Sequence, residues 1–75
     1  MTLTGRIVVK TVSPGSKSER RAVCIETPDG TYVLRPRGAH PLRIPPELEA
    51  LEGRNVRAEG TLSTGTFIAT SWEEQ

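Results

Sequence analysis

The sequence predicts an all-β protein with one short helix. Apolar and polar residues alternate along five separate segments, and this period of two is that of strands with one buried face. Helical spacing is seen in residues 46–53, where Leu48 and Leu51 lie three positions apart. With 75 residues, 35% of them apolar, the chain can build one small core. A single domain over residues 1–75 is therefore expected.

The first strand is predicted over residues 3–12, where apolar residues at odd positions alternate with mostly polar ones. Gly5 falls among the inward positions, and small barrels use glycine there to let a strand bend sharply. Residues 13–19 are rich in Ser, Pro and Gly, so they are expected to form a loop.

A second strand is predicted over residues 20–27, and a hairpin signal follows it at residues 27–31, Thr-Pro-Asp-Gly-Thr. Proline presets the first central position of a turn, and glycine takes the left-handed position after it. We expect a three-residue loop, which places Ile25 opposite Val33. A tighter turn made by the Asp-Gly pair alone is the alternative.

The third strand is predicted over residues 31–35. The choice of hairpin loop decides which face of the sheet Tyr32 occupies, because a shift of one residue moves every side chain to the other face. Both faces therefore stay open for Tyr32. Residues 36–44 contain two prolines and a glycine and are expected to be irregular, with Leu42 and Ile44 as anchors to the core.

A short helix is predicted to begin at Pro46 and to stop at Gly53. Proline fits the first helical position, glycine fits the left-handed stop, and glutamates in the first turn suit the positive end of the helix dipole. A helix of this length is not stable alone. Leu48 and Leu51 are therefore expected to plug an apolar opening in the sheet.

The last two strands are predicted over residues 55–62 and 66–72, joined by a Ser-Thr-Gly turn. Phe67 and Trp72 are expected to pack in the core. The tail, residues 73–75, is expected to be solvated.

One passage resembles the helix-to-strand-4 segment of many bacterial oligonucleotide/oligosaccharide-binding (OB-fold) proteins: the pattern L-x-x-L-x-G-x-x-V-x-x-x-G-x-L that begins at Leu48. The order of three strands, a helix and a hairpin resembles the OB-fold over essentially the whole chain. The chain is also similar to small stand-alone bacterial proteins of unassigned role. The resemblance implies a five-stranded OB-type Greek-key barrel. It also implies that a ligand lies across the second and third strands, beside the loops that join strands 1–2 and 4–5.

Charge is divided unevenly along the chain. Residues 1–45 carry eight Lys and Arg against three Asp and Glu, a formal charge of +5, whereas residues 46–75 carry two against six, a charge of −4. Such asymmetry is a hint of an anionic partner. The predicted nucleic-acid or anion-binding residues fall at the ligand positions that the resemblance implies: Lys17, Arg20, Arg21, Tyr32, Arg35 and Arg37.

In this prediction the five cations neutralise phosphates and Tyr32 stacks on a base. Because the chain has only three aromatic residues, any binding is expected to be weak and strongly dependent on salt. The alternative is a set of surface arginines matched by nearby glutamates.

Other motifs give no catalytic or metal site. Residues 15–18, Gly-Ser-Lys-Ser, resemble the end of a nucleotide-binding P-loop, but the earlier glycine is absent and a strand follows. His40 has no carboxylate or cysteine neighbours in the sequence, and Cys24, between Val23 and Ile25, is interpreted as a small core residue. No nucleophile–base set appears, so neither an enzyme nor a cofactor is expected.

These patterns predict a non-enzymatic module that binds single-stranded nucleic acid or another polyanion. The alternative is a protein-interaction or assembly domain, whose oppositely charged halves could pair between copies. The single cysteine makes no disulfide framework, and neither a signal pattern nor an apolar run of about 20 residues appears. A soluble cytoplasmic protein, bacterial in style and without a membrane partner, is expected.

Overall fold

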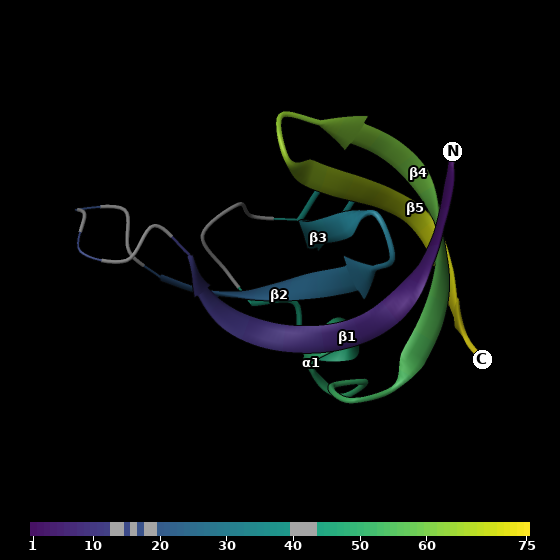
Figure 1. Cartoon of the computed structure of the whole chain (residues 1–75), viewed down its shortest axis with the longest axis horizontal. Helices are drawn as coiled ribbons and strands as arrows, with labels where there is room; N and C mark the ends of the chain where they lie inside the picture. Colours follow the sequence, from purple (N-terminus) through teal and green to yellow (C-terminus); the bar gives the residue numbers. More distant parts are fainter. Residues whose placement is uncertain (13–14, 16, 18–19, 40–43) are drawn as a thin grey trace.

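The computed structural model describes residues 1–12, 15, 17, 20–39 and 44–75, which form five strands and one short helix (Figure 1). In chain order the elements are β1 (Thr2–Val12), β2 (Arg20–Thr27), β3 (Gly30–Pro36), α1 (Pro46–Glu49), β4 (Asn55–Ser63) and β5 (Thr66–Glu74). The mostly-β class with one short helix is confirmed, and each strand begins and ends within two residues of its predicted bounds. The predictions for His40 and Leu42 lie outside the described residues.

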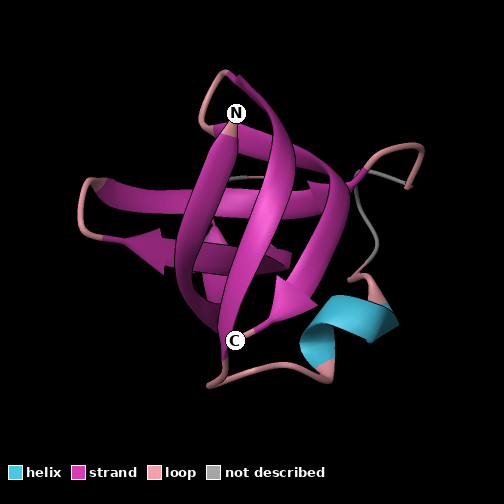
Figure 2. Ribbon diagram, turned by 90° about the vertical axis from the view of Figure 1, so that its right-hand side faces the viewer, coloured by secondary structure: helices cyan, strands magenta, loops and turns pink. Residues whose placement is uncertain are grey.

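All five strands belong to one sheet that closes in a ring (Figures 1 and 2). Their order is β1-β2-β3-β5-β4, and β4 pairs back with β1. Only the β3–β5 pairing is parallel. Strand β1 pairs with two neighbours: its first half pairs with β4 and its second half with β2. The change of partner falls at Gly5 and Arg6, where a side chain on Gly5 would overlap the carbonyl oxygen of Glu26. Glycine therefore permits the close approach of the strands at this point.

The predicted register of the β2–β3 hairpin is wrong by one residue. Ile25 lies opposite Tyr32, where the three-residue loop had placed Val33. Pro28 and Asp29 alone form the loop, because Thr27 pairs directly with Gly30. The Thr27 hydroxyl stabilises this turn, since it accepts from the backbone N–H of Asp29 at 3.2 Å and donates to the Gly30 carbonyl at 2.8 Å.

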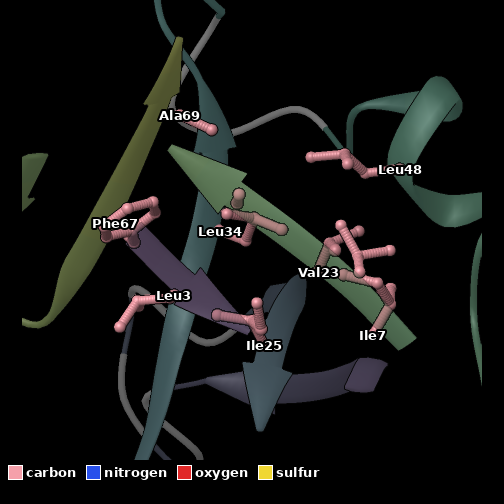
Figure 3. Packing of buried hydrophobic residues seen from close by; sticks show 10 residues of the cluster. Leu3, Ile7, Val23, Ile25, Leu34, Leu48, Phe67 and Ala69 are labelled. Carbon is pink, nitrogen blue, oxygen red and sulfur yellow. The ribbon is translucent and has the colours of Figure 1, made fainter. Parts of the chain in front are cut away.

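The core fills the inside of the ring. Its side chains come from every strand and from α1, and Figure 3 shows them converging. The largest fully buried residues are Phe67, Ile7, Ile25, Leu34, Leu48, Val23 and Val56. Each such side chain contributes roughly 1.5–3 kcal/mol by leaving water. Tyr32, Ile44, Leu51 and Trp72 are half-buried and pack against this cluster.

The helix is shorter than predicted, because only Pro46–Glu49 form α1 and the chain continues through turns to Gly53. It carries no side-chain cap, so it depends on tertiary contacts. Leu48 supplies these contacts, since it is fully buried and points toward the other core residues (Figure 3). After the helix, Gly53 (φ +84°) donates its N–H to the Ile7 carbonyl at 2.7 Å, which ties the turn to β1.

A β-bulge interrupts the β4–β5 hairpin. Glu59 pairs with Ser71, but the next residue, Gly60, pairs with Ala69, which leaves Thr70 as the extra residue. The Thr70 hydroxyl donates to the Glu59 carbonyl at 3.2 Å. The bulge reverses the alternation of β5, so Phe67 before it and Trp72 after it both pack toward the core. The strand also extends to Glu74, beyond its predicted end at residue 72.

Candidate nucleic-acid interface

The outward side of β1, β2 and β3 forms the surface on which the predicted ligand site lies. Residues that alternate with the core side chains of these strands point outward. We call this surface the outer β2–β3 face, and its members include Val8, Lys10, Arg20, Ala22, Cys24, Glu26, Val33 and Arg35.

The floor of the outer β2–β3 face is made of small apolar side chains. Cys24 lies opposite Val8 on one neighbouring strand and opposite Val33 on the other. Ala22 and Cys24 are buried, with 7% and 3% of their surface exposed, although they point away from the core cluster. The interpretation of Cys24 as a small buried residue is therefore confirmed, and the register places it on the outward side of the sheet.

Charged side chains surround this floor. Lys10 and Glu26 form an ion pair at 3.5 Å, although they belong to different strands and are not directly opposite each other. Burial raises the pKa of the Cys24 thiol above its ordinary value; Lys10 and Arg20 oppose this rise, and Glu26 adds to it. The strand register places the same three charged groups on the outward side of β1 and β2, on which Cys24 also lies.

The structure places two of the predicted arginines in strands on the outer β2–β3 face. Arg20 shares the outward alternation of Ala22 and Cys24, and Arg35 shares that of Val33. Arg37 follows β3, and its N–H donates to the Ala69 carbonyl at 2.8 Å, which continues the β3–β5 ladder. It is exposed in the turn that begins after Pro36.

The other predicted residues lie elsewhere. Arg21 alternates with Arg20, so it points to the opposite side of β2, where it is exposed near the strand end. Tyr32 faces the core, which settles the orientation that the sequence left open. Tyr32 and Arg35 therefore do not share a face, and base stacking by Tyr32 stays a prediction that its half-buried position does not favour. Lys17 is exposed in the connection between β1 and β2.

The cations on this face are largely without carboxylate partners. Within the described ranges, the ion pairs shorter than 4.0 Å are Lys10–Glu26 and Arg54–Glu74. Arg20, Arg35 and Arg37 take part in neither. The alternative of arginines matched by nearby glutamates does not hold for these three among the described residues.

Sequence reasoning left Lys10 out of the site, although strand alternation already placed it outward beside the basic residues of β2. In the part of the chain that the structure describes, no three His, Cys, Asp or Glu side chains are arranged to hold a metal ion. The described helix, α1, is too short to cross a membrane.

Comparison of the chain with protein-family models, with curated proteins and with solved structures finds no match. The candidate site therefore has to be judged on its own geometry and charge.

Proposed function

We propose that this chain is an OB-type binding module whose outer β2–β3 face binds the backbone of single-stranded nucleic acid, without catalysing a reaction. The strand order β1-β2-β3-β5-β4, the return of β4 to β1 and the helix between β3 and β4 support the OB-type assignment. In that fold the face over strands 2 and 3 is the usual ligand surface.

The observation that carries the proposal is that Arg20 and Arg35 lie on one face with Lys10, while Arg37 is exposed directly after β3; none of these three arginines pairs with a carboxylate among the described residues. A guanidinium without a carboxylate partner can donate two parallel hydrogen bonds to a phosphate. The side chains between these cations, Ala22, Cys24 and Val33, are small and apolar, and two of them are buried.

The proposed binding mode uses charge and not stacking. Phe67 is fully buried, and Tyr32 and Trp72 pack against the core, so all three aromatic residues of the chain are engaged inside. Stacking contributes roughly 1–3 kcal/mol per base in proteins that use it. Without it, binding is expected to be weak, indifferent to base sequence and sensitive to salt.

Fluorescence anisotropy with a labelled single-stranded oligonucleotide of about 12 nucleotides tests the proposal. We expect binding at about 20 mM salt that weakens sharply at about 200 mM salt. Arg35→Gln should weaken it several-fold. Arg54→Gln makes the same charge change, but Arg54 is paired with Glu74 and lies on neither β2 nor β3, so it should have little effect.

Two outcomes would overturn the proposal. One is the absence of binding at low salt. The other is an equal loss of affinity in Arg35→Gln and Arg54→Gln, because attraction to the overall charge would then explain the binding without this face.

A second candidate function is assembly through oppositely charged surfaces. The exposed carboxylates of α1 and of the β4–β5 hairpin, such as Glu47, Glu49 and Glu73, could receive the basic face of another copy or of a partner protein. Light scattering over a range of concentrations tests self-association. A molar mass that rises with concentration at low salt would favour it, and a strict monomer would leave only other partner proteins.

A further inference from the structure

A hollow of about 150 Å³ lies on the β4–β5 hairpin, away from the outer β2–β3 face. It is lined by Arg57, Glu59, Ser71, Trp72 and Glu73. Arg57 lies directly opposite Glu73, and Glu59 lies directly opposite Ser71. All four of these residues alternate with the inward-facing Ala58 and Trp72, so their side chains surround the hollow from the outside of the sheet.

The β-bulge creates this arrangement. Without Thr70 as an extra residue, the alternation that turns Phe67 and Ala69 inward would also turn Ser71 and Glu73 inward. The bulge instead sends these two polar side chains outward, next to Arg57 and Glu59. The hollow therefore follows from a register feature that no motif in the sequence reveals.

The size of the hollow suits a single side chain. A water needs about 10–15 Å³ of such volume, so the space holds roughly ten waters. Sites for whole cofactors or drug-sized ligands are usually about 300–1,000 Å³. A ligand here is therefore one extended group that enters from solvent.

The charges around the hollow do not neutralise one another. Arg57 lies between two carboxylates in the ladder, yet neither Glu59 nor Glu73 comes within 4.0 Å of it to form an ion pair, and no other described residue pairs with any of the three. The hollow therefore presents two separate acceptors and one donor group. Its formal charge of −1 favours a cation, and the Arg57 guanidinium among its lining residues disfavours a metal ion.

We propose that this hollow binds a basic side chain carried by a peptide segment. Glu59 and Glu73 accept hydrogen bonds from its guanidinium or ammonium group, and Arg57 donates to a backbone carbonyl oxygen of the same segment. The proposal does not rest on nucleic-acid binding, since it involves a different surface and the opposite ligand charge.

Titration of the protein with the blocked tripeptide acetyl-Gly-Arg-Gly-amide tests the proposal. Trp72 lines the hollow but its side chain packs toward the core, so backbone amide NMR shifts detect binding and locate it. We expect saturable changes at residues of the hollow, and none with acetyl-Gly-Gln-Gly-amide. The double variant Glu59→Gln/Glu73→Gln should weaken binding about threefold to tenfold.

Two further variants separate a built site from general attraction. Glu47→Gln/Glu49→Gln removes the same charge from α1 and should leave the affinity unchanged. Arg57→Gln should weaken binding if the guanidinium holds the peptide carbonyl, whereas simple attraction between charges predicts tighter binding of a cation. Absence of binding at millimolar peptide, equal losses in the two glutamate pairs, or tighter binding by Arg57→Gln would each overturn the proposal.

Discussion

Gly60 lies so close to the backbone of the neighbouring strand that only glycine fits there. A Cβ atom at this position would overlap the carbonyl oxygen of Ile68 on β5, next to the bulge. Gly5 is in the same situation against Glu26. In both places the atoms in the way belong to the backbone, which cannot move aside as a flexible side chain can. The two glycines therefore allow the strands to approach closely enough for the ring to close.

Gly60→Ala is therefore expected to lower the free energy of unfolding by about 1–3 kcal/mol, the usual cost of forcing extra volume into a packed site. Urea denaturation followed by Trp72 fluorescence measures it. Thr61→Ala, at the exposed neighbouring position of β4, serves as control and should stay within about 0.5 kcal/mol of the native protein. A Gly60→Ala protein as stable as this control would show that the strands can separate without cost.

Cys24 is expected to make the free energy of unfolding depend on pH in the alkaline range. Burial raises its thiol pKa in the folded state above the unfolded value of about 8.5. The unfolded chain then loses the proton first, so this contribution to stability is complete below about pH 8.5 and declines as the pH rises above it. As the pH rises above about 8.5, the free energy of unfolding should fall by more in the native protein than in Cys24→Ala. Equal falls in both proteins would mean that the thiol does not contribute.

At the scale of elements, α1 is held by one side chain. A single turn without a side-chain cap has little stability of its own, but Leu48 is fully buried and closes one part of the core. Leu48→Ala is expected to cost about 2–5 kcal/mol, a large part of the stability of a domain of this size. Urea denaturation measures the loss, and the exposed Glu49→Ala is the matched change on the same turn. A loss of less than about 0.5 kcal/mol would show that α1 contributes little to the stability of the fold.

The elements could be predicted because each rests on local signals. Alternation marks the strands, and Pro46 and Gly53 mark the start of the helix and the turn after it. The register could not be predicted: a three-residue loop and an Asp-Gly turn both fit the turn sequence, but both are wrong, because the loop is Pro28-Asp29 and the Thr27 hydroxyl bonds across it. The bulge at Thr70 and the parallel β3–β5 pairing depend on closure of the whole ring, which no local pattern carries.

The same distinction applies to the candidate site. Composition placed arginines along β2 and β3, but only alternation with the correct register separates Arg20 and Arg35 from Arg21 and Tyr32. The hollow on the β4–β5 hairpin was missed altogether, because its four polar side chains are brought together by the bulge. The sequence thus shows which charged residues each strand carries, but the register of the strands determines which of their side chains share a face.

At the scale of the whole molecule, charge is segregated in space as well as in sequence. Lys10, Arg20 and Arg35 lie on the outer β2–β3 face, and the hollow on the β4–β5 hairpin has a formal charge of −1. A polyanion that approaches the basic face is therefore repelled from the acidic surface, which favours one orientation on the protein. The net charge of +1 conceals this separation.

This separation predicts how oligonucleotide affinity responds to salt. If the face neutralises three or four phosphates, the slope of log affinity against log salt concentration should be about −2 to −3 for a single strand. Arg35→Gln removes one such contact and should make the slope shallower by about 0.7, whereas Arg54→Gln, at the Glu74 ion pair, should not change it. Anisotropy titrations between about 20 and 200 mM salt measure both slopes. If the two variants gave the same slope, the phosphates would be neutralised by cations other than those on the outer β2–β3 face.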